Sequence, residues 1–340
     1  MSRFQPAKKL VREYFDALEK CQVSEVQLVM DEFMSDDYEF LGSYPFRERS
    51  GKAEVAAKVW EPLKQSLTRM QRRQDIFIGG QNEFNDEIWV MSMGHFMGLF
   101  DTDWLGIKHT GKIQHLRYAE FSCIENGKIT KTGLFLDLIG FMNQAGCYPL
   151  PPMTGSHFVY PGPRNHDGLL FEDAPAEESA KTQEVMNLMV DDIDRLNKTA
   201  PFADMETLRE CLRLRWQEDM IWYGPCGIGA QYTIPRYQKG HQMPFRSGLK
   251  DKVFNGHVCR FAEGSFSCFF GWPNLSNKPI GGFLGLPGGE VKADMQVVDV
   301  YYRKDDKLSE NWVLIDIPYW LKQQGLDVLE RTTEITNPKL

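Results

Sequence analysis

An internal repeat constrains this sequence more than any other feature. Shifting the chain against itself by 179 residues aligns five pairs without a gap: Glu120 with Asp299, Lys128 with Lys307, Asp137 with Asp316, Gln144 with Gln323, and Gly146 with Gly325. Upstream, residues 37–42 resemble 219–224 and residues 89–94 resemble 266–271. A period near half of a 340-residue chain indicates two copies of one domain rather than a solenoid of short repeats.

The composition changes once, between the two halves. The segment 148–178 holds six of the 18 prolines and shows no periodicity, so it can be neither helix interior nor central strand. Because a long structureless loop inside one domain is uncommon, we expect a linker that wraps over a surface. The predicted domains are therefore residues 1–147 and residues 179–340, the second more divergent, with the linker at 148–178.

Each half shows helical periodicity first and strand alternation later. Apolar residues recur on one helical face in four segments: 6–20, 52–70, 179–197 and 205–218. Alternating runs follow in the first half, and the last two meet at the hairpin signal Glu125-Asn126-Gly127-Lys128; the runs are 74–80, 86–99, 112–125 and 128–137. A short helix from Leu138 to Ala145 follows. This order predicts an α+β fold, helices packed on a curved antiparallel sheet, and lacks the alternation of a Rossmann domain.

Composition excludes several classes of function. The net charge of -8 argues against a nucleic-acid-binding surface. No apolar stretch approaches the roughly 18 residues of a membrane span, and the N-terminus has no secretory pattern. Seven scattered cysteines suit free thiols in a reducing compartment, so we expect a cytoplasmic protein. The phosphate-loop, dinucleotide and nucleophile-elbow motifs are missing, and the histidine spacing does not indicate a metal.

The first half resembles the SnoaL-like branch of the NTF2-like (cystatin-like cone) superfamily. The resemblance rests on order and spacing: Asp37-x-x-Phe, Gly51-Lys52 before a helix that reaches Trp60, Trp89, Gly94, Thr110-Gly111-Lys112, Asn126-Gly127-Lys128-Ile129, and Asp137 before Gln144-Ala145-Gly146. Residues 205–325 match more weakly, with Gly289-Glu290-Val291 in place of Thr110-Gly111-Lys112.

The resemblance implies two tandem cones, each with an open mouth for a small apolar ligand. In polyketide cyclases of this family an aspartate at the position of Asp137, helped by a histidine on a nearby strand, performs acid/base catalysis without a cofactor. Family members commonly pair through their sheets, so an internal pseudo-dimer is implied, and a homo-oligomer stays open.

Asp137 follows the apolar run Gly133-Leu134-Phe135-Leu136. A carboxylate in such a stretch is costly to bury unless it is paired, and burial would raise its pKa toward neutrality, which suits proton transfer. The alternative role for Asp137 is structural, as the N-cap of the helix that follows.

The hairpin turn decides which residues face Asp137. A three-residue turn with a bulge at Gly127 places Asp137 opposite His115, with Arg117 on the same face. A two-residue turn shifts the register by one and places it opposite Leu116, with Tyr118 diagonal and Glu120 farther along that face. We expect His115 in the first case, or Tyr118 in the second, to lie beside Asp137 on the concave face.

The remaining candidates carry weaker signals. His95 lies between Gly94 and Gly98, which permit close approach of a backbone or ligand. The charged run 71–75 is interpreted as a solvated or salt-bridging rim. In the second half the same hairpin register count sets Asp316 opposite Asp294. Four other residues could line a pocket there, although each could equally be an ordinary core or surface residue: Trp222, Tyr223, His241 and His257.

These features predict a cofactor-independent acid/base enzyme that acts on a small, apolar carbonyl compound, as a cyclase, isomerase, hydratase or lyase. Asp137 would be the catalytic acid/base with His115 as its partner. The substrate would contact Arg117, His95, Tyr118, Glu120 and Trp60. The rival hypothesis is a non-catalytic ligand-binding or assembly module, because a fold does not dictate a function. A closed apolar cavity with converging polar groups favours the enzyme, and a filled cone favours assembly.

Overall fold

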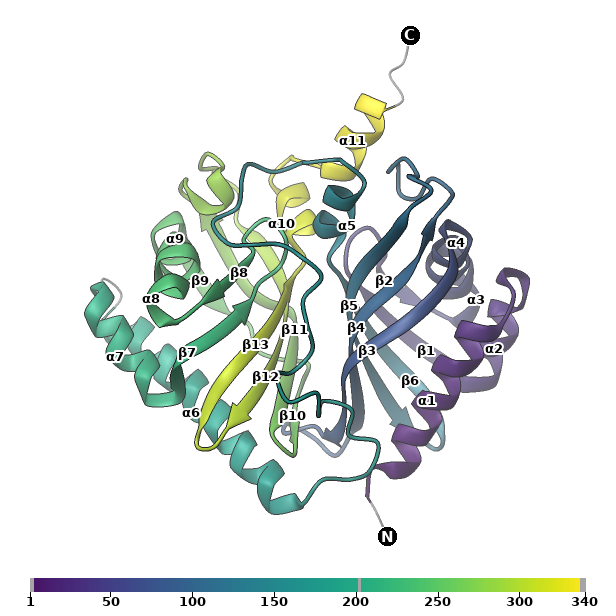
Figure 1. The fold of residues 1–340 in the computed structure, drawn as a ribbon, viewed down its shortest axis with the longest axis horizontal. Helices are drawn as coiled ribbons and strands as arrows, with labels where there is room; N and C mark the ends of the chain where they lie inside the picture. Colours follow the sequence, from purple (N-terminus) through teal and green to yellow (C-terminus); the bar gives the residue numbers. More distant parts are fainter. Residues whose placement is uncertain (1–2, 201–202, 337–340) are drawn as a thin grey trace. The chain divides into compact units, whose positions relative to one another are not determined.

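The computed structural model describes residues 3–200 and 203–336, so the outermost residues of the predicted domains lie outside it. The chain divides into two compact units. Unit 1 comprises residues up to Pro149, the segment Arg164–Asp173 and the residues from Leu314 onward; unit 2 comprises Leu150–Pro163 and Ala174–Val313. The predicted α+β class is confirmed, since each unit combines helices with one sheet (Figure 1).

Unit 1 is built on a six-stranded sheet in the order β2-β1-β6-β5-β4-β3. Its strands are β1 (Met34–Gly42), β2 (Arg47–Ser50), β3 (Leu67–Gln81), β4 (Ile88–Phe100), β5 (Ile113–Glu125) and β6 (Lys128–Leu136). All neighbours run antiparallel except β1 and β6, which are parallel. The predicted strands are therefore present, and β3 begins at Leu67, inside the segment 52–70 that the periodicity assigned to a helix.

Helices cover one face of this sheet in Figure 1. They are α1 (Gln5–Lys20), the 3₁₀ turn η1 (Val23–Glu25), α2 (Val26–Phe33), α3 (Lys52–Val55), the π-helical turn η2 (Ala56–Trp60) and α4 (Glu61–Ser66). The apolar stripe of α1 is buried, as predicted: Val11, Tyr14, Phe15 and Leu18. Three further helices belong to this unit: α5 (Leu138–Gln144), α10 (Ile317–Gln323) and α11 (Val328–Thr336).

Unit 2 repeats the strand order of unit 1 when its sheet is followed from β8 to β10. Its sheet runs β10-β11-β12-β13-β7-β8, with β9 also paired to β11. Its strands are β7 (Trp216–Tyr223), β8 (Ala230–Tyr232), β9 (Leu249–Phe254), β10 (Cys259–Glu263), β11 (Phe266–Pro279), β12 (Ala293–Lys304) and β13 (Lys307–Ile315). The pair β7–β13 is parallel and the hairpin β7–β8 antiparallel, matching β1–β6 and β1–β2.

The helices of unit 2 also follow the pattern of unit 1. They are α6 (Ala176–Thr199), α7 (Met205–Arg215), α8 (Ile234–Tyr237), the π-helical turn η3 (Gln238–Gln242) and α9 (Met243–Gly248), with a 3₁₀ turn η4 at Phe283–Gly285. Both units thus carry a short helix interrupted by a π-turn before the first long strand. π-turns of this kind occur often at functional sites.

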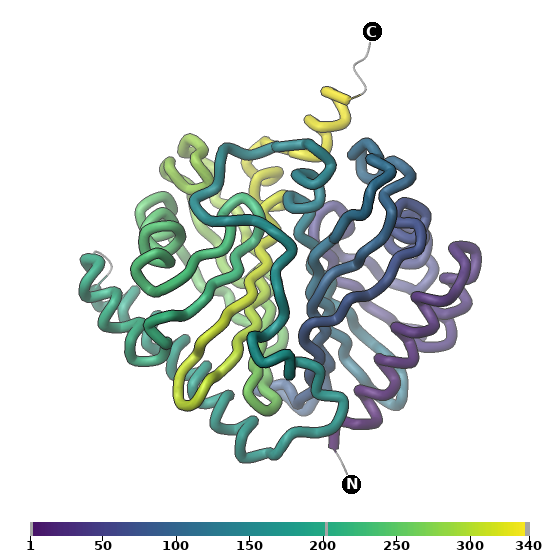
Figure 2. Tube along the Cα trace, viewed as in Figure 1, coloured from purple at the N-terminus to yellow at the C-terminus, as the bar shows by residue number. Residues whose placement is uncertain are grey.

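The segment between α5 and α6 has no helix and only isolated bridges, and Figure 2 traces it in teal. Its first part bonds within unit 2, where the Trp312 indole donates to the carbonyl of Pro161 at 3.1 Å. Its second part bonds within unit 1, where Phe77 donates to the carbonyl of Gly168 and Leu170 donates to that of Phe77. Both parts are therefore held by hydrogen bonds to backbone carbonyl groups.

Candidate functional site

The hairpin β5–β6 sets the surroundings of Asp137. The turn has two residues, Asn126 and Gly127, both with positive φ, and Glu125 pairs with Lys128. Beyond it, β6 contains one extra residue, so that Cys123 pairs with Lys131. The predicted register is therefore wrong in both of its forms, because a bulge one step past the turn adds a residue to the count. Asp137 lies opposite Arg117 and donates its N–H to the Arg117 carbonyl at 3.0 Å.

Asp137 is the N-cap of α5. Its side chain is buried, and the carboxylate accepts a hydrogen bond from the N–H of Gly140 at 3.0 Å. The backbone of His115 instead exchanges two hydrogen bonds with the Gln144 amide, at 2.9 and 2.7 Å. The structural alternative for Asp137 is thus realised, and His115 is not its strand partner.

Side-chain alternation separates the remaining candidates of unit 1. His115 and Arg117 lie on one face of β5, and His95, which pairs with Arg117, shares that face. The His95 and His115 rings are 6.0 Å apart, and His95 Nδ1 lies 3.4 Å from Asp75 Oδ2.

Tyr118 and Glu120 lie on the opposite face of β5, together with Phe96 of β4. The Phe96 ring stacks on Tyr118 at 4.3 Å and meets Trp60 edge-on at 5.8 Å. This helix-covered face therefore brings together three of the predicted residues, Trp60, Tyr118 and Glu120.

Arg72 is a central residue that sequence reasoning missed. The rim interpretation of residues 71–75 is wrong for it, because Arg72 pairs with Phe96 across β3–β4 and points into the interior. Its Nη1 donates to Glu120 Oε2 at 2.7 Å, and the two side chains are 6% and 0% exposed. Strand alternation could have identified Arg72, because residues two positions apart, such as Arg72 and Gln74, lie on the same face of a strand.

Burial raises the pKa of Glu120, although the neighbouring Arg72 opposes this shift. A hydrogen-bond chain continues from the pair: the Gln74 amide donates to Ser92 Oγ at 3.0 Å, and Ser92 Oγ lies 2.9 Å from the Tyr118 hydroxyl. Removing one member of a buried, hydrogen-bonded ion pair costs more than the pair itself contributes, since the other charge stays buried. The interior of unit 1 is thus filled by an ordered polar network.

The matching position in unit 2 is different. Asp299 of β12 occupies the place of Glu120 in the repeat, but none of the ion pairs between described residues involves it. Its Oδ1 accepts hydrogen bonds from the Tyr301 hydroxyl at 3.0 Å and the Asn311 amide at 3.1 Å. Burial raises the pKa of Asp299 to about 6, with both hydrogen bonds opposing the shift. Part of the residue remains accessible to solvent.

Two aromatic residues, Phe269 and Tyr301, lie directly beside Asp299, and further rings pack around them. Phe269 is the strand partner of Asp299 on β11, and the centroid of its ring lies 5.8 Å from that of the Tyr301 ring. The His257 ring stacks on Phe269 at 3.9 Å, and His241, from the π-turn η3, stacks on Trp222 at 4.0 Å. Burial lowers the pKa of each histidine to about 3, so both rings are neutral at pH 7. The interior of unit 2 combines a basic carboxylate with uncharged aromatic walls.

The other candidates of the second half have separate partners. Asp316 caps α10: its carboxylate accepts the N–H of Tyr319 at 3.2 Å and the N–H of Tyr44 at 2.8 Å, both within unit 1. Asp294 pairs with Ser276 and accepts its hydroxyl at 2.6 Å. Tyr223 stacks on Trp312 at 5.4 Å. None of these hydrogen bonds joins the two carboxylates that were expected to face each other.

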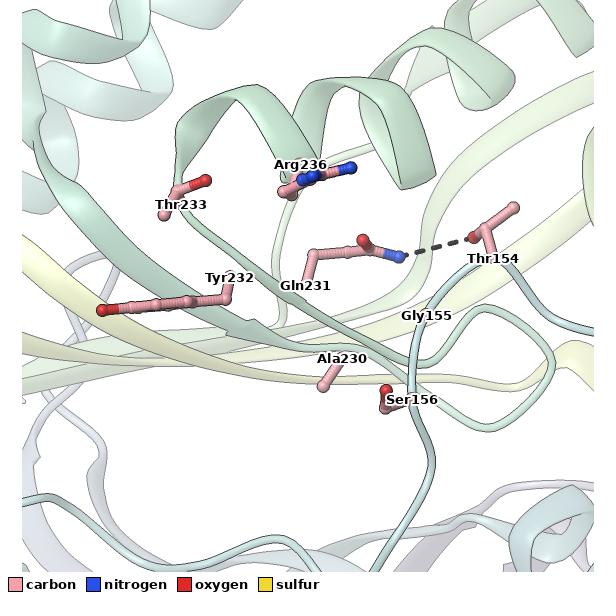
Figure 3. Close-up of a pocket in the computed structure, with 8 residues that line it drawn as sticks. All are labelled: Thr154, Gly155, Ser156, Ala230, Gln231, Tyr232, Thr233 and Arg236. Carbon is pink, nitrogen blue, oxygen red and sulfur yellow. Dashed lines mark hydrogen bonds between the residues drawn. The ribbon is translucent and has the colours of Figure 1, made fainter.

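Two cavities lie apart from the predicted residues. One, of about 480 Å³ in unit 2, is lined by segments 154–156 and 230–233 and by Arg236, and Gln231 donates to Thr154 Oγ1 across it at 3.4 Å (Figure 3). The other, of about 600 Å³ in unit 1, lies between α1 and β3 and reaches Arg72 and Gln74.

One group of side chains among residues 3–200 and 203–336 has ligand atoms within 4.8 Å of one another: Glu87, Cys123 and Glu125. Burial raises the pKa of the Cys123 thiol to about 12, and Glu87 already accepts the Trp89 indole N–H at 2.9 Å. In the described part of the chain, no helix is both long and apolar enough to span a membrane.

No protein-family model and no curated protein matches the chain. Solved structures resemble parts of it. A candidate polyketide cyclase from Xanthomonas campestris pv. campestris is 18% identical over 42% of this chain and 97% of its own, with a TM-score of 0.33. A candidate SnoaL-like polyketide cyclase from Jannaschia sp. CCS1 is 17% identical over 44% and 94%, also at 0.33. An NTF2-like protein from Burkholderia xenovorans LB400 is 10% identical over 43% and 97%, at 0.33.

Proposed function

We propose that this chain is a cofactor-independent acid/base enzyme acting on a small, apolar carbonyl compound, and that Asp299 of unit 2 is its catalytic base. One observation carries the proposal: the carboxylate of Asp299, a residue that is only partly buried, has two hydrogen-bond donors on a single oxygen and lies beside the aromatic side chains of Phe269 and Tyr301. We also propose that the two units are tandem SnoaL-like domains, which the shared strand order supports.

The chemistry follows from the two oxygens of Asp299. Oδ1 is held by Tyr301 and Asn311, which fix the orientation of the carboxylate. Oδ2 receives no hydrogen bond from a described residue and is the atom that would take a proton from the carbon next to the substrate carbonyl. A pKa of about 6 keeps the group ionised at pH 7 yet more basic than an ordinary aspartate, which suits proton abstraction and return.

Unit 1 fits the rival, non-catalytic role. Its matching carboxylate, Glu120, is fully buried and bound by Arg72, so it cannot reach a substrate without rearrangement. The roles of Asp137 and His115 in catalysis stay predictions, and the cap that Asp137 forms on α5 gives that residue a structural role instead.

Exchange of α-hydrogens for deuterium tests the proposal without knowledge of the natural substrate. Small ketones such as 2-tetralone and cyclohexanone would be incubated with the full chain in D₂O and followed by proton NMR. Asp299→Asn keeps the shape of the side chain and removes the base, so it should lower the exchange rate by about 10²–10⁴-fold.

Asp137→Asn and Glu120→Gln are the matched controls, and we expect both to retain exchange. Full activity in Asp299→Asn would contradict the assignment, and loss of activity in Asp137→Asn alone would move the active site to unit 1. Circular dichroism of each variant would verify that the fold persists.

A further inference from the structure

The guanidinium group of Arg72 is surrounded by aromatic rings. Its Cζ lies 3.6 Å from the ring centroid of Phe15, 4.8 Å from that of Phe96, 4.9 Å from that of Tyr118 and 5.8 Å from that of Trp60. All four distances fall within the roughly 6 Å over which a cation is attracted to the face of a ring. The four rings come from α1, η2, β4 and β5, so they form a cage rather than a single stacking surface.

A carboxylate closes this cage. Glu120 Oε2 accepts the hydrogen bond from Arg72, whereas Glu120 Oε1 is buried and has no hydrogen-bond partner among the described residues. The indole Nε1 of Trp60 is likewise buried without a partner. Most buried polar atoms of a native protein have a hydrogen-bond partner. Two such atoms without a partner in one cage indicate that Arg72 does not use all the hydrogen-bonding groups of its lining.

The cage has an opening. The cavity of about 600 Å³ between α1 and β3 reaches Arg72 and Gln74 from the solvent side. Three acids of α1 line it, Glu13, Asp16 and Glu19, and Glu19 accepts the backbone N–H of Arg72 at 2.6 Å. Two basic side chains of the same helix, Lys9 and Arg12, also line the cavity, so its mouth carries both signs of charge, and the acid that favours a cation is Glu120 inside the cage.

We propose that the interior of unit 1 is a binding site for a small organic cation, an alkylguanidinium or alkylammonium, and that the protein fills this site with its own Arg72 side chain. Aromatic walls with an acidic residue at the base are the chemistry that recognises such cations. Removing the Arg72 side chain therefore converts an occupied site into an open one. This inference does not depend on the function proposed for unit 2.

The test is rescue of Arg72→Ala by an added cation. Without the side chain, Glu120 is left as a buried, unpaired carboxylate, so the melting temperature of the variant should fall. Methylguanidinium chloride at millimolar concentration should then raise it saturably, by roughly 2–5 °C at ten times the dissociation constant. The wild type should show no such rise, because its site is occupied.

Two controls separate a specific site from a general salt effect. N-Methylurea has a similar shape without the charge and should not stabilise Arg72→Ala, and sodium chloride at equal ionic strength should not either. In the double variant Arg72→Ala with Glu120→Gln, the response to methylguanidinium should weaken at least tenfold in apparent affinity.

Rescue that is absent in folded Arg72→Ala, or equal in the wild type, would overturn the proposal. If Arg72→Ala does not accumulate as a folded protein, its refolding yield from urea becomes the measurement. A yield that rises with methylguanidinium but not with N-methylurea supports the filled site, and equal yields in both contradict it.

Discussion

Glu120 and Asp299 occupy matching places in two sheets of the same strand order, yet their surroundings give them opposite properties. Glu120 is fully buried and bound to a cation. Asp299 is partly accessible and receives only neutral donors, Tyr301 and Asn311. A carboxylate without a cationic partner keeps more of the pKa rise that burial causes. The neighbours, rather than the acids themselves, therefore distinguish a structural carboxylate from a candidate base.

Tyr301→Phe should raise the pKa of Asp299 further above its value of about 6. The Tyr301 hydroxyl donates to Oδ1 and thereby stabilises the ionised form, so its loss favours the protonated form. Because the base must be ionised to accept a proton, deuterium exchange should increase with pH through this pKa, and the midpoint should move to higher pH in the variant.

Tyr223→Phe, another buried tyrosine of unit 2 that does not bond Asp299, is the control and should leave the midpoint in place. Carbon-13 NMR of the Asp299 carboxyl would measure the pKa independently of any substrate. An unchanged or lowered pKa in Tyr301→Phe would show that the hydroxyl does not stabilise the carboxylate.

At the scale of single elements, Asp137 and α5 act together. Asp137 accepts the N–H of Gly140, which would otherwise have no partner in the first turn of the helix. Asp137→Ala should therefore lower the free energy of unfolding by about 1 kcal/mol or more, whereas Asp137→Asn should cost less because asparagine also caps helices. Urea denaturation would measure both. Equal losses in the two variants would mean that the cap is not what Asp137 contributes.

Gly94 lets β3 and β4 approach closely at a bulge. A Cβ at this position would lie 2.0 Å from the carbonyl oxygen of Arg73, whereas one at Gly98 would lie 3.0 Å from that of Thr68. Since backbone cannot move aside as a side chain can, Gly94→Ala should destabilise unit 1 by about 1–3 kcal/mol, and Gly98→Ala by less. Chemical denaturation would rank them, and the reverse order would contradict the close approach seen at the bulge.

At the scale of the whole chain, Asp316 joins residues far apart in sequence. Its carboxylate bonds the N–H of Tyr44, 272 positions earlier, and Arg47 Nη1 lies 3.6 Å from it. The C-terminal helices therefore belong to the compact unit that begins at the N-terminus. The repeat alone had assigned these helices to the second copy.

The stability of the protein should depend on pH through Asp316. Burial raises the pKa of this carboxyl to about 6 from 3.8, and the side chain is 1% exposed. Between these two values the native state holds a proton that the unfolded state has lost, so stability falls as pH rises from about 4 to 6, by ~3 kcal/mol for this group. Asp316→Asn should remove this part of the slope.

Urea denaturation at several pH values would measure the effect of Asp316. The comparison uses the difference between the wild type and Asp316→Asn, because Asp299 titrates in the same range in both proteins. Parallel slopes in the two proteins would show that Asp316 has no raised pKa in the native state.

Local patterns in the sequence predicted the α+β class, the apolar stripe of α1, four of the six strands of unit 1 and the position of the hairpin turn. These follow from periodicity and from glycine in the turn, which are local properties. The repeat also pointed from Glu120 to Asp299, and three of the residues expected to contact a substrate, Trp60, Tyr118 and Glu120, do lie on one face of the sheet.

Which polar groups meet depends on how the strands and helices pack. A single extra residue in β6 changed the strand partner of Asp137, because one position in register moves every following side chain to the other face. The ion pair of Arg72 with Glu120 joins residues 48 apart on strands separated by β4, and no local pattern encodes that distance. Likewise, the pKa of Asp299 depends on burial by rings from other strands, which exists only once the sheet and its helices are packed.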